Sequence, residues 1–344
     1  MVHFWGPRIL FLGFGNVGRR VVEILANPAE YPRIEDLGDY LVVGIVTRSH
    51  GATLNPRGLD LKRILEEWNR EGRFGGEVDA ATAIRETNHN LVVEMTPLDI
   101  PGRGAEAIRH VRMALEDGSD VITCNKGPVA WAWHELRELA YEKGRGIVCE
   151  TTVMDGVPVF NLIQRSLKGN RILKLEGILN STTNYVLSEM GKGVSLEDAV
   201  AGAQRLGVAE ADPSNDLEGW DAAVKVAALA NVLLGPGVEL RPEKVERESL
   251  RAVTPERIRE AAARGARLKV VCETYREHYH QVTGRVKIRE VPLTDPFALV
   301  SGTSSILRVT TDIAGKVVIT EEDPDLSTTA YGVISDLFRL REGF

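Results

Sequence analysis

The chain contains 344 residues, of which 43% are hydrophobic and 26% are charged. This composition is typical of globular proteins and excludes collagen, long coiled coils and extended disorder. The formal net charge of −7 lacks the positive balance of nucleic-acid-binding proteins, and no apolar run reaches the ~18–20 residues of a membrane span.

The first 150 residues alternate short apolar runs with amphipathic segments. Uninterrupted apolar strands indicate a parallel sheet that is covered on both faces. We therefore predict an α/β fold with a Rossmann-type doubly wound sheet. The predicted strands are 9–15, 41–47, 90–96, 120–126 and 146–152. The predicted helices are 16–26, 59–72, 104–118 and 134–144, and residues 28–40 are predicted to form a surface loop.

The pattern changes after residue 150. An alternating run at 171–180 indicates a strand of a second sheet, three helical segments follow up to residue 235, and 266–320 is rich in predicted strands, including 297–302. Residues 327–340 are again helical. We predict a dinucleotide-binding domain over 1–150, completed by a returning helix within 324–344, and an α+β substrate-binding, catalytic and dimerisation domain over 151–323.

Cysteine usage and the N-terminus indicate the cellular setting. Cys124, Cys149 and Cys272 are widely spaced and form no CxxC pair, so neither a structural zinc site nor a disulfide framework is expected. The N-terminus runs directly into the first motif, without the features of a signal peptide. We therefore expect a cytoplasmic protein.

A glycine-rich motif follows the first predicted strand and opens the first predicted helix. It reads Gly13, Phe14, Gly15, Asn16, Val17 and Gly18. In a GxGxxG motif the first glycine permits the tight turn, the second lets the backbone approach a pyrophosphate, and the third allows close packing of helix and strand. The helix N-terminus then holds the phosphates. The motif in this context predicts a nicotinamide dinucleotide cofactor.

The end of the second strand bears on the choice of dinucleotide. An acidic residue there would bind the ribose hydroxyls of NAD, whereas an arginine accommodates the 2′-phosphate of NADP. Here the strand is followed by Arg48, and Lys62 of the next helix is predicted to join it in an anion site. NADP is therefore favoured, and NAD stays open as the alternative.

Two lysines are candidates for the chemistry. Lys126 follows the fourth strand, and the carboxyl ends of parallel strands face the ligand crevice. Lys225 lies four residues after Asp221, so the two share one helix face among apolar neighbours. This setting predicts a partly buried pair rather than a weak surface salt bridge, and such a lysine can protonate a developing alkoxide. Asp216 is predicted to cap the helix.

Seven segments together resemble homoserine dehydrogenase over nearly the whole chain. The pairing of an NSTTNY element with an E-x-D-P…GxDxxxK stretch is specific to that family. The matching segments are 13–18, 92–97, 124–130, 150–158, 177–187, 207–229 and 329–337.

The resemblance implies NAD(P)-dependent interconversion of L-homoserine and L-aspartate 4-semialdehyde, a step of threonine and methionine biosynthesis. It implies that Lys225 donates the proton to the aldehyde oxygen, that Asp221 orients the substrate, and that Lys126 lies over the cofactor and the substrate oxygen. The other substrate-binding residues implied by it are Glu210, Asp212, Thr182 and Thr183. The residues implied to line the nicotinamide side are Thr96, Pro97 and Gly207.

The resemblance also implies a monovalent cation, typically sodium, and a homodimer. The cation ligands would be Glu150 and backbone oxygens of Val153, Asp155 and Val157, which are hard oxygen donors. The apolar strand at 267–275 separately suggests a sheet shared across a two-fold interface.

Two positions depart from the family pattern. Ser181 replaces a usual glycine, and residues 322–327 replace a glycine-rich loop that approaches the cofactor. The short chain resembles members without a regulatory ACT domain, so feedback inhibition through such a domain is not expected. The alternatives are a related amino-acid semialdehyde oxidoreductase and a non-catalytic NADP-binding sensor, the latter favoured only by the altered loop.

Overall fold

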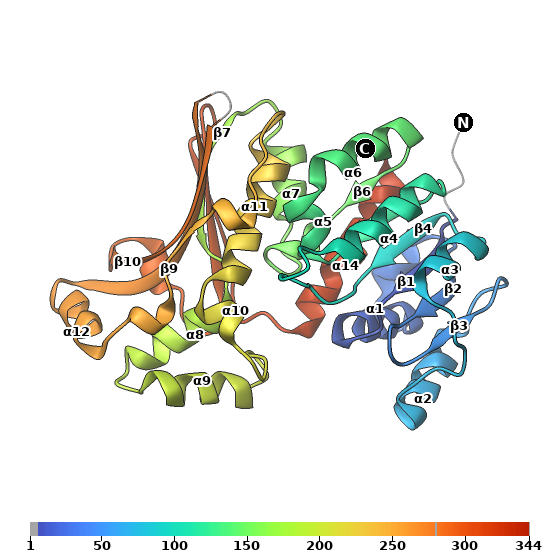
Figure 1. The fold of residues 1–344 in the computed structure, drawn as a ribbon, viewed down its shortest axis with the longest axis horizontal. Coiled ribbons are helices and arrows are strands. Elements are labelled where there is room, and N and C mark those ends of the chain that lie inside the picture. The colour runs from blue at the N-terminus through green and yellow to red at the C-terminus, as the bar shows by residue number, and fades with distance from the viewer. Residues whose placement is uncertain (1–5, 279–280, 344) are drawn as a thin grey trace. The chain divides into compact units, whose positions relative to one another are not determined.

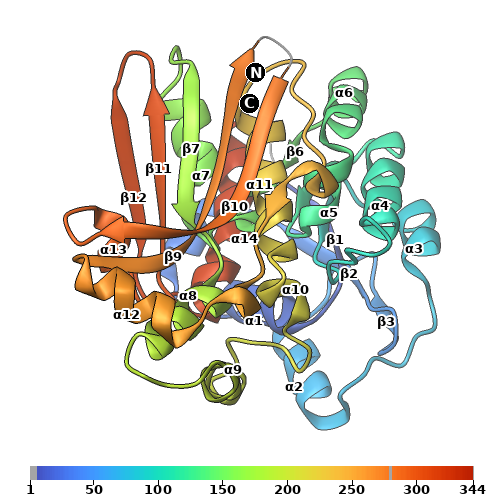
Figure 2. The ribbon, with the colours of Figure 1, turned by 60° about the vertical axis from the view of Figure 1, so that its left-hand side comes forward.

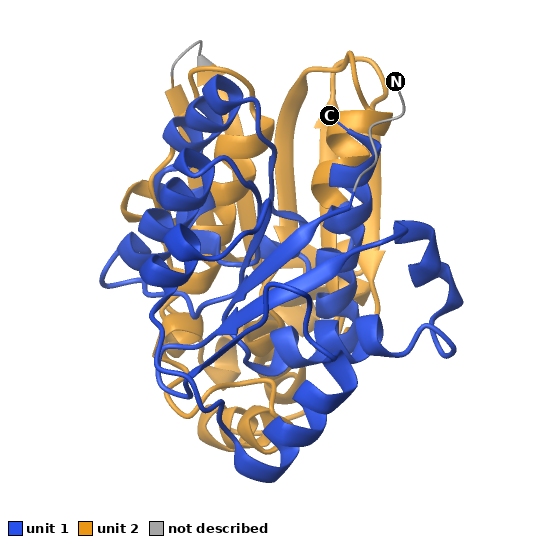
Figure 3. Ribbon diagram, turned by 90° about the vertical axis from the view of Figure 1, so that its right-hand side faces the viewer, with its two compact units in different colours: residues 1–158, 325–344 blue, residues 159–324 orange. Residues whose placement is uncertain are grey.

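The computed structural model describes residues 6–278 and 281–343. The chain divides into two compact units (Figure 3), Met1–Pro158 together with Asp325–Phe344, and Val159–Pro324. They are called unit 1 and unit 2 below. None of the described helices combines the length and apolar character needed to cross a membrane.

Unit 1 contains a six-stranded sheet with the order β3-β2-β1-β4-β5-β6. All neighbours in it pair parallel except β3, which forms an antiparallel edge against β2. The strands are β1 (Arg8–Leu12), β2 (Leu41–Val46), β3 (Ala52–Leu54), β4 (Leu91–Glu94), β5 (Asp120–Thr123) and β6 (Ile147–Val148). The parallel strands are almost entirely buried, as the uninterrupted apolar runs predict. The predicted α/β class is confirmed.

Helices accompany this sheet along the chain (Figure 1). They are α1 (Asn16–Ala26), α2 (Leu61–Glu71), α3 (Ala80–Glu86), α4 (Ala105–Glu116), α5 (Lys126–Trp131), α6 (Trp133–Lys143) and α14 (Leu326–Glu342). The last helix begins with a capping box between Asp325 and Thr328. It packs against α1, and its buried face, including Val333 and Leu337, shares the core with Ile9 and Val22.

The segment predicted as a surface loop before β2 is only partly a loop, so that prediction is wrong in detail. Residues Pro32–Leu37 form the 3₁₀ helix η1. Ile34 and Leu37 within it are buried in the core of unit 1. In the sequence these two apolar residues are surrounded by a proline and charged residues, so they form no recognisable apolar pattern.

Unit 2 contains a second six-stranded sheet with the order β12-β11-β7-β9-β10-β8 (Figure 2). Its neighbours pair antiparallel, except that the short β8 pairs parallel with β10. The strands are β7 (Ile172–Ile178), β8 (Glu246–Arg247), β9 (Ala266–His278), β10 (Gln281–Pro292), β11 (Ser305–Thr311) and β12 (Lys316–Glu321). The helices are α7 (Val159–Asn161), α8 (Ser181–Met190), α9 (Leu196–Arg205), α10 (Ser214–Leu217), α11 (Trp220–Leu233), α12 (Pro255–Ala263) and α13 (Pro296–Leu299).

The strand predicted at 297–302 is wrong, because these residues begin in α13. Asp295 caps this helix by accepting a hydrogen bond from Phe297 N–H (3.0 Å). Pro296 occupies the first helical position, where the missing N–H costs nothing. Phe297 then packs into a small core with Ile178, Val271 and Ile306.

The two faces of this sheet differ in chemistry. The face with Leu175, Cys272 and Val286 is buried, and α11 packs on β9 and β10. The opposite face carries charged side chains in cross-strand register, with Arg308 opposite Glu176, Glu176 opposite Glu273, and Glu273 opposite Arg285. This row is called the charged ladder below.

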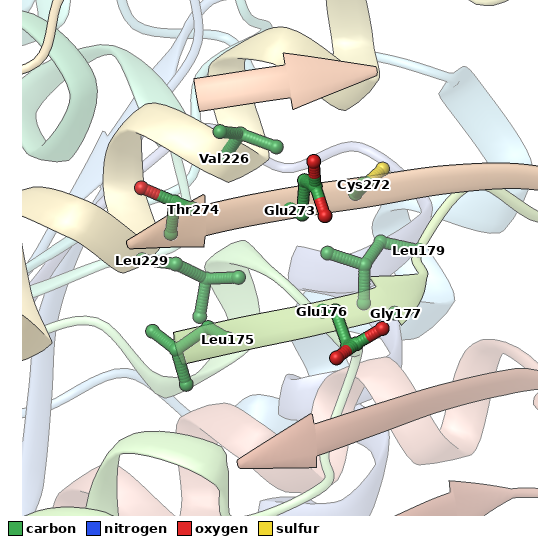
Figure 4. A pocket seen from close by; sticks show the side chains of 9 residues that line it. All are labelled: Leu175, Glu176, Gly177, Leu179, Val226, Leu229, Cys272, Glu273 and Thr274. Atoms are coloured by element: carbon green, nitrogen blue, oxygen red, sulfur yellow. The ribbon is translucent and has the colours of Figure 1, made fainter. Parts of the chain in front are cut away.

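A small hollow lies between β7, β9 and α11 (Figure 4). Leu175, Leu179, Val226 and Leu229 line it, and it has no room for a molecule the size of water. The hollow is therefore a packing feature rather than a ligand site.

Candidate active site

The glycine motif of unit 1 has the backbone geometry that its spacing predicts. Gly13 has φ +102°, and a Cβ there would lie 2.6 Å from the carbonyl oxygen of Met95. A Cβ on Gly18 would lie 3.1 Å from the oxygen of Gly13. A Cβ on Gly15 would meet nothing within 4 Å. The first and third glycines are therefore required by packing, whereas the second leaves open space.

The open space lies at the start of α1. Gly15 is the N-cap of this 11-residue helix, without a side-chain cap and without an acidic residue in the first turn. The first N–H groups and the helix dipole are thus suited to a phosphate. Phe14 is buried and packs edge-on against Trp68 with ring centroids 4.9 Å apart. Asn16 accepts a hydrogen bond from Arg19 (2.5 Å), and Val17 packs on the core.

The turn after β2 presents a cation and no acid. Thr47 holds the turn by accepting a hydrogen bond from His50 N–H (2.8 Å). Arg48 at its tip has a side chain that is 88% exposed, and its guanidinium lies 4.0 Å from Glu106 of α4. A pair at this distance and exposure is weak, so Arg48 is accessible to a phosphate.

Lys62 does not lie beside Arg48, which corrects the predicted two-residue anion site. The start of α2 lies near the beginning of β2, because Leu59 N–H donates to the oxygen of Val42 (2.8 Å). The end of the helix approaches the turn, where Trp68 stacks near His50 with ring centroids 5.6 Å apart. Lys62 is thus about 9 Å of helix rise from Trp68.

A second cation beside the turn was missed from the sequence. Phe74 N–H donates to the oxygen of His50 (2.7 Å), which brings the exposed Arg73 next to the 47–51 turn. Arg73 is 25 residues from Arg48 in the chain, and no local motif joins the two.

The carboxyl ends of β4 and β5 form a polar network around Thr96. Glu94 accepts hydrogen bonds from Thr96 N–H (2.9 Å) and the Thr96 hydroxyl. Asn125 Nδ2 donates to the oxygens of Thr96 (3.0 Å) and Pro97 (3.1 Å). Asn125 Oδ1 also caps α5 at Gly127 N–H (2.8 Å), so Lys126 begins a fixed helix.

In unit 2 a cluster of polar side chains surrounds Lys225. Asn180 Nδ2 donates to Asp216 Oδ1 (2.7 Å) and to Asp221 Oδ2 (3.0 Å). Lys225 Nζ lies 3.5 Å from Asp221 Oδ2 and donates to the oxygen of Leu179 (2.5 Å). The cluster thus joins the end of the loop before α8 with α10 and α11.

Burial controls the electrostatics of this cluster. The side chains of Lys225 and Asp221 are 15% and 16% exposed, so the pair is partly buried, as its apolar neighbours predict. Burial and the nearby Asp221 carboxylate raise the pKa of Asp216, although Asn180, Thr182 and Lys225 act to lower it. An ammonium in such a setting can donate a proton to a developing oxyanion.

Asp216 is not the cap of α11, which corrects the prediction. Gly219 occupies the N-cap position with φ 74°, and Asp216 instead turns toward Asn180. Asn180 itself was missed as a site residue. Its position before the Ser181–Met190 helix is a cap signal, and its Oδ1 does accept from Thr183 N–H (2.8 Å).

The remaining substrate-binding predictions fall into two groups. Thr182 and Thr183 are buried in α8, where Thr182 donates to the oxygen of Val208 (3.1 Å) and Thr183 to the oxygen of Asn180 (3.1 Å). Glu210 and Asp212 lie in the exposed 207–213 loop that begins at Gly207 with φ 72°. Hydrogen bonds from the hydroxyl of Ser214 and from its N–H (3.1 Å) lower the pKa of Asp212. The Glu210 carboxylate contacts none of the described polar groups, and the structure does not bring it to Lys225.

The two departures from the family pattern are accommodated. Ser181 is the first residue of α8, where a helical backbone accepts a side chain. In 322–327, Asp325 caps α14 in unit 1, and Asp323 N–H in unit 2 donates to Ser304 Oγ (3.0 Å). These two acids therefore have structural roles.

The segment predicted to hold a cation is tightly folded. Glu150 is 1% exposed in the 3₁₀ helix η2 (Glu150–Thr152). Asp155 has φ 43° and accepts a hydrogen bond from Thr329 (2.9 Å). Across residues 6–278 and 281–343, no three His, Cys, Asp or Glu side chains gather as a metal site. Backbone carbonyls of Val153 and Val157 would have to supply the other oxygens.

The fold and these features define a class: an oxidoreductase with a NAD(P)-binding domain. A model of the homoserine dehydrogenase NAD-binding domain matches residues 13–150, and the homoserine dehydrogenase model matches residues 158–338. The chain belongs to the homoserine dehydrogenase family.

Individual relatives agree with this assignment. Homoserine dehydrogenase of Methanocaldococcus jannaschii is 33% identical over 96% of this chain and 98% of its own length. An NAD(+)-dependent homoserine dehydrogenase of Pseudomonas canavaninivorans is 32% identical over 97% and 96%. The crystal structure of a putative homoserine dehydrogenase from Archaeoglobus fulgidus superposes with a TM-score of 0.87 at 31% identity, over 97% and 99% of the chains. A hyperthermophilic archaeal homoserine dehydrogenase in complex with NADPH gives 0.83 at 29% identity, over 99% of each chain. Neither alternative function is favoured.

Proposed function

We propose that the chain interconverts L-homoserine and L-aspartate 4-semialdehyde with NADP as the preferred cofactor, in threonine and methionine biosynthesis. The observation that carries the proposal is the Asp221–Lys225 pair, which is partly buried and linked to Asp216 through Asn180. Family membership supplies the substrate class. Unit 1 is the dinucleotide-binding domain in this proposal, and unit 2 binds substrate and forms the dimer.

The residues of the cluster divide the work. When bound, the nicotinamide ring accepts or supplies the hydride. Lys225 donates a proton to the aldehyde oxygen during reduction, and it must be neutral to accept one during homoserine oxidation. Asp221 holds Lys225 and orients the substrate hydroxyl. Oxidation of homoserine should therefore accelerate toward alkaline pH.

The other roles follow the polar chemistry of the substrate. A free amino acid carries an ammonium, for which Glu210 and Asp212 offer carboxylates from the 207–213 loop. Thr182 and Thr183 form the floor of the substrate site. Lys126 acts at the cofactor and the substrate oxygen.

Preference for NADP rests on the end of β2. Arg48 is exposed at the tip of the turn, and no acid follows the strand to bind ribose hydroxyls. Arg73 lies beside the same turn and replaces Lys62 as the second cation. A planar guanidinium suits a phosphate better than an ammonium does. The remaining contacts come from the glycine motif, Thr96, Pro97 and Gly207.

A monovalent cation, with sodium as the first candidate, fits the Glu150 segment. Asp336 Oδ2 accepts a hydrogen bond from Glu150 N–H (2.8 Å), so two buried carboxyl groups lie close together. A cation held by Glu150 and by carbonyls of Val153, Asp155 and Val157 would offset the negative charge of this segment. Dialysis against a sodium-free buffer should lower thermal stability, and readdition should restore it. A melting temperature that is independent of the cation at constant ionic strength would contradict this site.

We also propose a homodimer, with the charged ladder as the interface. The apolar residues of β9 that first suggested an interface are buried within the chain itself, since Val270, Val271 and Cys272 are at most 5% exposed. On the other face, Glu176 and Glu273 are only 13% and 12% exposed. Light scattering should give twice the 37.8 kDa chain mass. Arg289 lies beside the ladder, with its guanidinium 3.9 Å from Glu176 and 3.5 Å from Glu273, so Arg289→Glu should reduce the measured mass.

The test of the proposed activity is formation of reduced nicotinamide from L-homoserine at alkaline pH, with NAD and NADP compared in one buffer. Turnover with NADP above NAD supports both the activity and the cofactor preference. Turnover with NAD alone would keep the activity but remove the preference. No turnover with either, despite cofactor binding, would refute the activity.

A further inference from the structure

The carboxyl-terminal ends of the unit 1 strands, where the glycine motif lies, are called the cofactor edge. A buried carboxylate lies beneath this edge, and the proposed mechanism gives it no role. Glu94 ends β4 and is 0% exposed. It is in register with Leu12 of β1 and with Thr123 of β5. The next residue, Met95, is the one that Gly13 packs against. Glu94 therefore lies on an inner strand of the sheet, at the cofactor edge that carries the glycine motif.

Hydrogen bonds alone hold this carboxylate. Its Oε1 accepts from the N–H and the hydroxyl of Thr96, and its Oε2 accepts from the Thr123 hydroxyl (3.1 Å). Among the residues that the structure describes, Glu94 forms no ion pair. A fully buried acid with three donors and no cation is expensive to keep ionised. Such a group is uncommon away from functional sites.

The bonds of Glu94 extend to both candidate groups of this edge. The N–H and the hydroxyl of Thr96 both donate to the same oxygen of Glu94, which fixes the position of Thr96. Asn125 then links the carbonyl of Thr96 (3.0 Å) to the first turn of α5, which Lys126 opens. Displacing Glu94 would release Thr96 first and the start of α5 second.

We propose that Glu94 is a positioning residue for the nicotinamide half of the cofactor, and that its negative charge favours the oxidised, cationic ring over the reduced, neutral one. The inference rests on the proposed cofactor site at this edge. It concerns a residue to which neither the sequence motifs nor the family resemblance assigned a role.

The charge on Glu94 is sensitive to pH in the working range. Burial raises the pKa of Glu94 to about 7, although hydrogen bonds from Thr96 and Thr123 oppose this, and the Glu106 carboxylate on α4 raises it further. Cys124 directly follows β5. Burial raises the pKa of its thiol to about 12, so the thiol stays neutral. Lys126 begins α5 at the same edge. Glu94 is thus protonated below neutral pH and ionised above it.

The decisive quantity is the ratio of the dissociation constants of NADPH and NADP⁺. This ratio cancels the titration of groups that both ligands share, including the 2′-phosphate. NADPH binding is followed by its fluorescence and NADP⁺ binding by calorimetry, from pH 6 to 8.5. If the ring charge shifts the pKa of Glu94 by one unit, the ratio rises about tenfold with pH in the wild-type protein.

Three variants and one control variant separate charge from position. Glu94→Gln keeps the size and an acceptor for Thr96 N–H, and the ratio should become independent of pH. Glu94→Asp keeps the charge but withdraws it from Thr96, so both ligands should bind more weakly while the pH dependence persists. Glu106→Gln should move the midpoint to lower pH. Glu116→Gln, at the exposed end of the same helix, should leave it in place.

The outcomes are distinguishable from failure of the proposed activity. A ratio that is flat in the wild-type protein, or a pH dependence that survives in Glu94→Gln, overturns the role of Glu94. The wild-type titration needs no variant to fold and no turnover. Homoserine oxidation with a flat ratio would therefore refute only this inference, whereas a pH-dependent ratio without turnover would refute only the activity.

Discussion

The cofactor edge of unit 1 and the Asn180 cluster of unit 2 are built in opposite ways. The first uses backbone from one contiguous hexapeptide, residues 13–18, and its second glycine presents open space rather than a side chain. The second uses side chains from three separate segments, at Asn180, Asp216 and 221–225, held within hydrogen-bond distance. A backbone site can therefore be recognised from glycine spacing, whereas a side-chain site exists only once its segments meet.

The largest effect is expected from a substitution in the side-chain site of unit 2. Lys225→Ala should lower turnover by about 10²–10⁴-fold, the usual contribution of a general acid or base. NADPH binding should be unchanged, because unit 1 does not depend on this side chain. The measurements are kcat and a fluorescence titration of NADPH. Lys192→Ala is the matched control, since Lys192 is an exposed lysine of unit 2 that pairs with Glu189. Unchanged turnover in Lys225→Ala would remove the residue from the mechanism.

Two alanine substitutions in the glycine motif test the backbone site of unit 1. Gly13→Ala places a Cβ 2.6 Å from Met95 O at φ +102°, and should destabilise the fold by about 1–3 kcal/mol. Gly15→Ala has φ −73° and free space, so the free energy of unfolding should change by less than about 1 kcal/mol. Gly15→Ala should nevertheless weaken NADP binding by at least about tenfold, because the methyl occupies the place of a phosphate. Denaturation and ligand titration on both variants check this, and normal binding by Gly15→Ala would contradict it.

Asn180→Ser tests whether the cluster depends on its bridging amide. Serine still caps α8, but its single hydroxyl cannot donate to both carboxylates. Asn180 lowers the pKa of Asp216, so this pKa should rise further in the variant. A carboxyl whose folded pKa is raised loses stability as pH rises from its unfolded to its folded pKa. The variant should therefore be less stable than wild type at neutral pH and equal to it at low pH. Turnover should fall about tenfold, and a pH-rate profile identical to wild type would contradict the role.

An effect of about the same size is expected at the exposed turn after β2. Arg48→Ala and Arg73→Ala should each weaken NADP binding by about tenfold, corresponding to about 1.4 kcal/mol for a charge-assisted contact, with little effect on NAD. Lys62→Ala is the control, because the structure separates it from the turn. Isothermal titration with both dinucleotides checks the difference. An equal loss for NAD and NADP would show that neither arginine holds the 2′-phosphate.

Local patterns account for most of the fold. The parallel strands of unit 1 are buried on both faces, so they appear as uninterrupted apolar runs, and Ser195 caps α9 by accepting from Asp198 N–H (3.1 Å). Two of the differences between prediction and structure have clear physical reasons. The 297–302 run is apolar but begins after an Asp-Pro cap, and η1 has too few apolar residues to show a period.

Local sequence patterns predict the class of fold, the glycine motif and the i, i+4 placement of Asp221 and Lys225, because each depends on residues that are close in the chain. Contacts between distant segments are needed to see that Asn180 joins Asp216 to Asp221, that Arg73 rather than Lys62 borders the 47–51 turn, and that Glu94 is buried without an ion pair among the described residues. These three depend on strand register and on contacts between distant segments. Hydrogen bonding and desolvation act between groups that are close in space but far apart in the chain, so no periodicity in the sequence predicts them.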